Sequence, residues 1–289
     1  MKRNAHLQAV LGLILGAIMA VALTATAQTS PNGTGGFQEE FHQTYPFSAT
    51  GSLELNNING HVQISAWDRN EVNVDAVKWA WSKERLDEAK ITVEPSSDRI
   101  SIRTQYPQRD LTFNDGSHDN PASVDYTITL PRSARLDEVK LVNGNLTIDG
   151  ISGEVHASCV NGRLKATHLG SASRLSDVNG ALEAAFAQLP SGTLELHAVN
   201  GRLSLTLPSD VQATVKANTV NGSITNNFDL PVHKGRYVGS RLEGQLGSGG
   251  TEISLHNVNG RIEILHAEDG KPVSRATNLL PDSSEEAKF

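Results

Sequence analysis

The dipeptide Asn-Gly directly after a Val or Ile occurs seven times in this chain of 289 residues. From the second occurrence onward, the spacings are 18, 18, 21, 21 and 38 residues. A fixed period near 20 residues is typical of stacked-repeat proteins. We interpret the spacing of 38 as two repeats, one of them degenerate. The repeated pairs are Asn59 and Gly60, Asn143 and Gly144, Asn161 and Gly162, Asn179 and Gly180, Asn200 and Gly201, Asn221 and Gly222, and Asn259 and Gly260.

The residues around each Asn share a pattern of apolar positions. Four residues before, one before and three after the Asn are apolar in nearly every unit, as at Leu196, Val199 and Leu203. On either side of the Asn-Gly pair the alternation has a period of two, which indicates strands with one buried face. No unit has a helical period, so the sequence predicts an all-β fold.

Two arrangements of these strands are compatible with the Asn-Gly pairs. Asn-Gly favours two-residue hairpins, which would give an antiparallel hairpin meander. If the chain instead bends at Asn-Gly, both Val199 and Leu203 can point inward. Asn side chains of successive coils could then form a hydrogen-bonded ladder. We favour the second arrangement and expect a right-handed parallel β-solenoid (β-helix) of about 18–21-residue coils with Asn-Gly corners.

The chain divides into four segments. A basic start, an apolar run and the small residues at 25–27 predict a secretory signal peptide over 1–27. A polar, glycine-rich linker is expected over 28–47 and a polar tail over 267–289. The β-strand-repeat domain spans 48–266, with an irregular start over 48–137 and regular repeats over 138–266. Within it we expect a short helix over 82–90, a strand pair over 91–94 and 99–103, a strand over 124–130, and an insertion or looser coil over 228–250.

Composition limits location and chemistry. The apolar run near the N-terminus is shorter than the roughly 20 residues of a membrane-spanning helix, and no second candidate exists. We therefore expect an exported protein, in the periplasm, at the cell surface or secreted, with no transmembrane segment in the mature chain. After residue 27 there are 23 basic and 32 acidic residues, which give a formal charge of −9. This negative charge argues against binding to nucleic acid. A single cysteine, Cys159, excludes an internal disulfide framework.

No group of residues indicates catalysis, a cofactor or a metal. Enzymatic β-helices need carboxylates gathered on one face, but the acidic residues here stand at different offsets from their Asn. His197 and His256 share an offset, yet a long insertion separates them, so we expect no metal site. The acidic residues considered are Asp149, Glu154, Asp177, Glu183 and Glu195.

Two sets of side chains are candidates for a ligand surface. Arg163, Arg202 and Arg261 all stand two residues after their Asn and would form a broken basic stripe, which could bind an acidic glycan. Trp79 and Trp81 alternate with Ala80 and can share one face. They could cap the core or stack on a carbohydrate.

The Val-Asn-Gly units, the Leu-Pro-Arg sequence at 130–132 and the Gly-Ser-Gly-Gly-Thr run at 247–251 resemble a known family. It is the bacterial putative-adhesin family of β-strand-repeat proteins, a domain of unknown function, and the resemblance covers about residues 48–266. It implies an exported or envelope-associated β-helical protein and brings no catalytic residues. We expect a non-enzymatic protein that presents a repetitive surface, adhesin-like or scaffolding, to an unknown protein or glycan of the cell envelope. The alternatives are a carbohydrate-active β-helix enzyme acting on acidic glycans and an envelope-stress sensory or regulatory partner protein.

Overall fold

A computed structural model describes residues 36–107, 121–189, 192–235 and 238–280. The expected signal peptide lies outside these described residues. Apart from the short helix α1 (Lys83–Glu88), the regular structure is all β, as the alternation predicts. The strands are β1 (Phe37–Pro46), β2 (Ser52–Asn59), β3 (Val62–Trp67), β4 (Glu71–Ala80), β5 (Lys90–Pro95), β6 (Arg99–Gln105), β7 (Ser123–Pro131), β8 (Arg135–Asn143), β9 (Leu146–Asp149), β10 (Val155–Leu169), β11 (Ser173–Phe186), β12 (Thr193–Leu207), β13 (Ala213–Asn221), β14 (Ile224–Asn226), β15 (His233–Lys234), β16 (Ser240–Leu246), β17 (Thr251–Asn259), β18 (Ile262–His266) and β19 (Ala276–Asn278).

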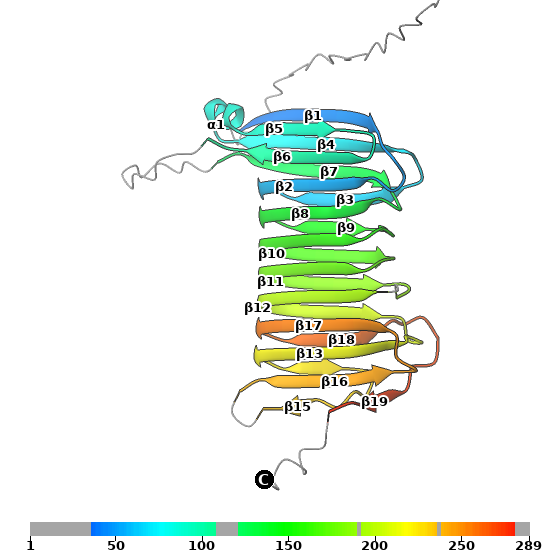
Figure 1. The fold of residues 1–289 in the computed structure, drawn as a ribbon. Coiled ribbons are helices and arrows are strands. Elements are labelled where there is room, and N and C mark those ends of the chain that lie inside the picture. Colours follow the sequence, from blue (N-terminus) through cyan, green and yellow to red (C-terminus); the bar gives the residue numbers. More distant parts are fainter. Residues whose placement is uncertain (1–35, 108–120, 190–191, 236–237, 281–289) are drawn as a thin grey trace, which may run out of the picture.

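The repeats stack as coils whose strands pair in parallel with the equivalent strands of the next coil (Figure 1). β10 and β11 each run through their Asn-Gly pair, with Asn161 opposite Asn179 and Gly162 opposite Gly180. β12 continues this register, with Asn200 opposite Asn179. A two-residue hairpin would require the two strands flanking Asn-Gly to pair with each other in antiparallel fashion. The hairpin alternative is therefore wrong for these repeats.

The order of the coils in space differs from their order in the sequence. β17 and β18 pair with β12 on one side, while β13 and β14 pair with them on the other. The coil of Asn259 therefore lies between the coils of Asn200 and Asn221, as the orange strands between the yellow ones show in Figure 1. Residues 227–250 do not form a degenerate repeat: β16 pairs antiparallel with β13, and β15 pairs antiparallel with β16. The interpretation of the 38-residue spacing as two repeats was wrong, whereas the expected insertion is present.

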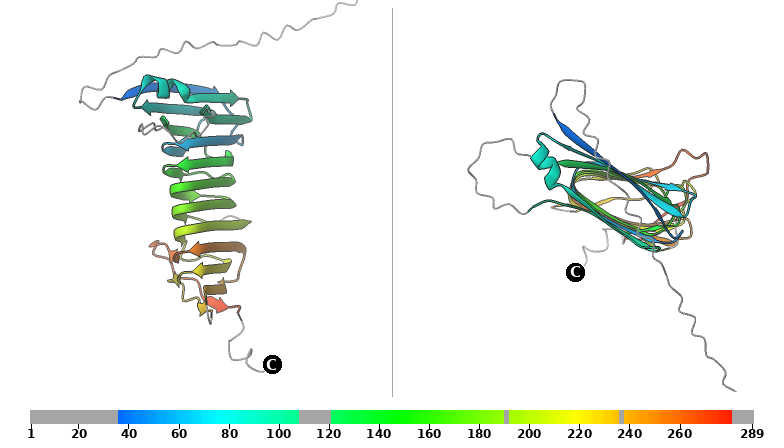
Figure 2. Two further views of the ribbon diagram at one scale, coloured as in Figure 1. Left: turned by 90° about the vertical axis from the view of Figure 1, so that its left-hand side faces the viewer. Right: turned by 90° about the horizontal axis from the view of Figure 1, so that it is seen from above.

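The core lies inside the stack. Seen along the stack, the strands enclose a flattened ring (Figure 2, right). Counting each repeat from its Asn as position 0, the side chains at −4, −2, +3 and +5 point into this ring, as Leu196, Ala198, Leu203 and Leu205 do. Such alternating burial over many coils supplies a continuous hydrophobic core.

The apolar residue at position −1 points outward, contrary to the expectation that both it and position +3 are buried. Val199 is 38% exposed, and its equivalents in the other coils are also on the surface. The physical reason is that the strand keeps its alternation up to the Asn, so position −2 points inward. The bend at Asn-Gly then adds one extra outward residue before the alternation resumes at position +3.

Additional strands close both ends of the stack. At the N-terminal end, β1 pairs antiparallel with β4, and β4 with β7. Residues 37–46 were expected to belong to a linker, but they form β1, because Lys78 of β4 is buried and lies 2.9 Å from Glu39. Ser82 caps α1, accepting a hydrogen bond from the amide of Arg85. At the other end, β19, within the expected polar tail, pairs with β16.

Candidate functional site

The Asn side chains of the seven coils form one continuous ladder along an edge of the stack. Each Nδ2 donates to the Oδ1 of the neighbouring Asn over 2.8–3.0 Å. The ladder follows the order in space, so Asn259 donates to Asn200, and Asn221 donates to Asn259. Each rung fixes the height of one coil relative to the next, which makes this edge regular over the whole stack.

The Gly that follows each Asn is required by the close approach of neighbouring coils. At Gly180, with φ of 158°, an added Cβ would overlap the carbonyl oxygen of Gly162. At Gly144, with φ of 139°, it would overlap the carbonyl oxygen of Gly60. A side chain at these positions would force the coils apart, so the Asn-Gly edge admits no other residue after the Asn without a shift of the backbone.

A row of β-branched apolar side chains runs beside the Asn ladder. We call it the valine stripe. Six of its members are 36–49% exposed, and the remaining one, Val160, is half-buried. In spatial order the stripe comprises Ile58, Val142, Val160, Val178, Val199, Val258 and Val220. Isolated exposed apolar residues are common on protein surfaces, whereas large apolar patches are typical of interaction surfaces.

Polar side chains occupy the buried position −2 behind the valine stripe. Four of them donate to the backbone carbonyl one coil away: Cys159 to Gly144 over 3.5 Å, Asn257 to Gly201 over 2.9 Å, Thr219 to Gly260 over 3.3 Å, and Asn57 to Val124 over 2.8 Å. These bonds join each buried polar side chain to the backbone of the neighbouring strand. The sequence reasoning missed this set because its members are polar.

Asp177 occupies the same position but cannot donate as a carboxylate. It is 2% exposed, and its Oδ1 has no hydrogen-bond partner. Its Oδ2 and the Gly162 carbonyl both lie over Gly180, as Cys159 and the Gly144 carbonyl lie over Gly162. Burial raises the pKa of Asp177 to about 6. Protonation gives the carboxyl an O–H group, which can donate a hydrogen bond to the Gly162 carbonyl.

The three arginines at position +2 lie on the outer surface and take part in ion pairs. Arg202 lies 3.0 Å from Glu183, and Arg261 lies 3.1 Å from Glu263. Arg163 lies 3.9 Å from Glu183. The coil order brings Arg202 and Arg261 onto neighbouring coils. Because two glutamates accompany the three arginines, the surface is a mixed ionic network and not a basic stripe.

The two tryptophans lie at the N-terminal end of the stack. Their ring centroids are 4.7 Å apart in an edge-to-face arrangement, and Trp79 and Trp81 are 38% and 54% exposed. Trp79 covers the backbone of Gly36. Both rings therefore extend the surface of β4 and lie outside the buried core.

The acidic residues considered for catalysis do not converge within the described part of the chain. Asp149 accepts hydrogen bonds from Thr167 and pairs with His168, and these contacts lower its pKa. Glu154 pairs with His156, and Glu195 pairs with Arg174. Glu154 and Glu195 both lie near Arg174 of the coil between them and raise its pKa, whereas Asp149 has partners of its own.

His197 and His256 lie closer together than their sequence separation indicated. The coil order makes them neighbours, and their rings stack with centroids 5.1 Å apart. Burial and the charge of His256 lower the pKa of His197. Among the described residues no group of three or more potential ligands is placed to hold a metal ion.

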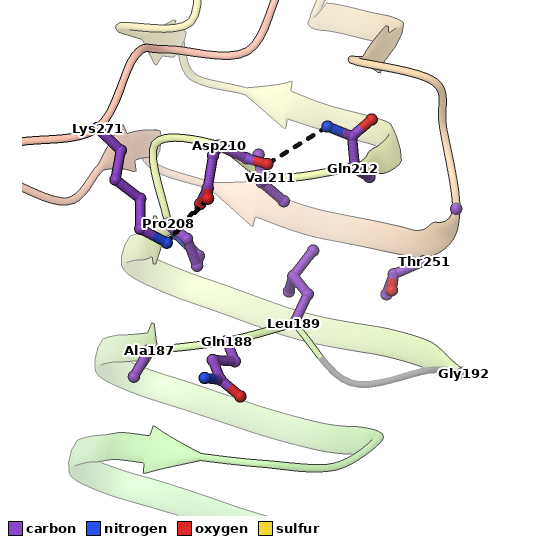
Figure 3. Close-up of a pocket in the computed structure, with 11 residues that line it drawn as sticks. Ala187, Gln188, Leu189, Gly192, Pro208, Asp210, Val211, Gln212, Thr251 and Lys271 are labelled. Carbon is purple, nitrogen blue, oxygen red and sulfur yellow. Dashed lines mark hydrogen bonds and ion pairs between the residues drawn. The ribbon is translucent and has the colours of Figure 1, made fainter. Parts of the chain in front are cut away.

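A pocket of about 640 Å³ opens on the edge of the stack opposite the Asn ladder. It lies between residues 187–189 and Gly192, which precede β12, and residues 208–212, which follow it (Figure 3). Leu189 and Val211 face each other across it, and the ion pair of Asp210 and Lys271, 2.8 Å apart, lies at one side. We call it the edge pocket.

A comparison with family models decides the relationship of the chain. The model of the Toastrack DUF4097 family matches residues 26–265. The chain belongs to this family. No curated protein matches it.

Several solved structures are similar to this Toastrack chain. One is a putative cell adhesion protein from Clostridium sporogenes, with 16% identity over 80% of this chain and 100% of that chain and a TM-score of 0.49. Another is a putative adhesin from Bacteroides fragilis, with 10% identity over 78% of this chain and 97% of that chain and a TM-score of 0.35. A putative adhesin from Parabacteroides distasonis has 9% identity over 79% of this chain and 97% of that chain, with a TM-score of 0.25.

The sequence of this Toastrack protein held signals for the features that sequence reasoning missed. The edge pocket falls in the two repeats with 21-residue spacing, which are longer than the 18-residue repeats before them. The outward valine stripe follows from counting strictly by two from the buried Leu196. No helix in the described residues is long and apolar enough to cross a membrane.

Proposed function

We propose that this protein is an exported, non-enzymatic binding protein that presents the valine stripe and the Asn ladder to a partner in the cell envelope. In this proposal residues 1–27 act as a signal peptide, and the coils wind as a right-handed β-solenoid. The right-handed sense agrees with the strong preference of parallel β connections. The proposal is supported by the exposed valine stripe and by the ion pairs that engage Glu154 and Glu195 locally.

The valine stripe is the observation that carries the proposal. A surface row of β-branched side chains on regularly spaced coils costs solubility and adds nothing to the core, because its members are 36–49% exposed or half-buried. The ladder beside it prevents the coils from sliding, so the row is preorganised. A preorganised apolar row loses little conformational entropy when a partner covers it.

The test replaces three stripe residues on neighbouring coils. The variant Val178→Ser/Val199→Ser/Val258→Ser should fold with an unchanged far-ultraviolet circular dichroism spectrum. It should fail to capture the envelope partner that the unmodified protein captures after cross-linking in its native envelope. The control variant, Val238→Ser/Val273→Ser, removes two valines that are 60% and 44% exposed elsewhere on the surface.

Capture of the same partner by the stripe variant would contradict the proposed surface. Loss of capture in an Arg163→Ala/Arg202→Ala/Arg261→Ala variant, with the stripe variant unaffected, would move the binding surface to the ionic network. Hydrolysis or lyase activity of the purified protein on envelope glycans would contradict the non-enzymatic role.

A further inference from the structure

We propose that the edge pocket binds a neutral, hydroxyl-rich ligand, a saccharide unit in chemical class. This site goes beyond the proposed function, because it lies on the edge opposite the valine stripe. β12 leads from the edge with the pocket to the edge with the Asn ladder and back. The chain enters β12 after Gly192, bends at Asn200, and returns to the pocket at residues 208–212.

The pocket arises from two features of the chain. The first is the longer spacing of the repeats at Asn179, Asn200 and Asn221, which is 21 residues instead of 18. Three residues separate the end of β10 from the start of β11, whereas six separate the end of β11 at Phe186 from the start of β12 at Thr193. The second feature is the inverted coil order, since residues 208–212 must pass the coil of Asn259 to reach β13.

In the regular repeats the backbone links one connection to the next: the amide of Ser152 donates to the carbonyl of Arg132 over 2.8 Å, and that of Gly170 donates to the carbonyl of Ile151 over 3.0 Å. Among the described residues no such backbone hydrogen bond joins residues 187–189 or Gly192 to residues 208–212. The pocket lies where this link between connections is missing, and its volume is within the range of ligand sites.

The lining combines an apolar wall with polar groups of both hydrogen-bonding types. Leu189, Pro208 and Val211 supply the wall. Asp210 offers acceptors and Lys271 offers donors side by side, with Lys271 Nζ 2.8 and 3.0 Å from the two carboxylate oxygens. The Gln188 amide, which is exposed on the opposite loop, can both donate and accept.

This combination favours a neutral polyol over an ion. One carboxylate and one ammonium group balance each other, so the pocket has no net charge to attract an anion or a cation. A charged ligand would have to break the Asp210–Lys271 pair. A sugar ring can place one hydroxyl toward the carboxylate, a neighbouring hydroxyl toward the ammonium group, and its C–H face against Leu189 and Val211.

The experiment titrates the whole chain with defined oligosaccharides and follows binding by isothermal titration calorimetry. The probes are maltohexaose, cellohexaose and chitohexaose, which are neutral, and hexagalacturonate, which is acidic. At least one neutral probe should bind, and both Asp210→Ala and Gln188→Ala should weaken its affinity at least about tenfold. The matched control is Arg69→Ala, which breaks an exposed ion pair, Arg69–Glu71 at 3.4 Å, toward the N-terminal end of the stack.

Three results would overturn the proposal: no binding of any neutral probe up to about 10 mM, binding of hexagalacturonate alone, or binding that the pocket variants leave unchanged. Thermal melting of each variant separates loss of the site from loss of the fold. The outcome is independent of the proposed function, because the stripe variant should retain oligosaccharide binding and the pocket variants should retain capture of the envelope partner.

Discussion

Position −2 of the repeat is where single residues decide the stability of the Asn-Gly edge. Its side chains are buried, yet most are polar, because they donate to a carbonyl of the next coil. Asp177 is the member whose ability to donate depends on pH. This buried, titratable position belongs to the structure of the edge and could not be read from a pattern of apolar residues.

The substitution Asp177→Asn should stabilise the protein near neutral pH. The amide donates to the Gly162 carbonyl at every pH, as Asn257 donates to Gly201. In the unmodified protein the carboxyl binds its proton more tightly when folded, with a pKa of about 6 against 3.8. The loss of folding free energy caused by ionising Asp177 is therefore absent below about pH 4. It grows as the pH rises and reaches roughly 2–3 kcal/mol above about pH 6.

Urea denaturation at pH 4 and pH 7 measures this difference. The stability gap between Asp177→Asn and the unmodified protein should widen from pH 4 to pH 7. Asp149→Asn is the control, and its effect on stability should change with pH in the opposite direction. The hydrogen bond from Thr167 lowers the pKa of Asp149, so the stability that ionised Asp149 contributes is lost as the pH falls. A gap that stays constant with pH would contradict the raised pKa, because it would show that Asp177 has the same pKa in the folded and the unfolded protein.

The glycines of the repeat should tolerate no side chain. Gly180→Ala places a Cβ against the Gly162 carbonyl and should cost at least about 3 kcal/mol, since the backbone must move. Gly270→Ala is the comparison: φ is 71° there but nothing lies within 4 Å, so only the roughly 1–2 kcal/mol of a left-handed alanine applies. Equal losses in chemical denaturation would contradict the close approach of the coils.

At the scale of the element, the ladder ties each coil to two neighbours, except at its ends. Asn200→Ala removes two rungs, to Asn179 and from Asn259, whereas Asn221→Ala removes the one rung to Asn259. At about 0.5–1.5 kcal/mol for each hydrogen bond, the first substitution should cost about twice as much as the second. Denaturation midpoints of the two variants check this ratio, and a larger loss at Asn221 would contradict it.

Most elements could be predicted from local signals. The helix after Ser82 follows from its capping residue, and β5 and β6 follow from two apolar runs across a turn. The side-chain direction at Val199 could not be predicted in the same way. Its apolar character indicated burial, whereas its direction is set by the one-residue bulge at Asn-Gly, which depends on neighbouring coils. β1 was missed because its sequence is polar and its pairing partner, β4, lies far along the chain.

At the scale of the whole molecule, the spacing of the Asn residues indicates how many coils exist but not their order. Residues 227–250 allow the chain to pass beyond the coil of Asn221 and return, and parallel pairing of Asn259 is equally good on either side. The order of the coils therefore depends on which of the two pairing positions the coil of Asn259 occupies. The edge pocket depends on that order, which is why no single repeat revealed it.

The coil order is the claim on which the edge pocket and the continuous stripe both depend, and a pair of cross-links tests it most directly. In a Cys159→Ser background, His197→Cys/His256→Cys places two cysteines on directly paired residues, within the Cα separation of a disulfide. In His197→Cys/Asn218→Cys, a whole coil separates the two cysteines, because His256 lies between His197 and Asn218. Under mild oxidation, mass spectrometry should find the disulfide in the first variant and free thiols in the second. A disulfide in the second variant and none in the first would contradict the inserted coil, because the repeats would then be stacked in the order of the sequence.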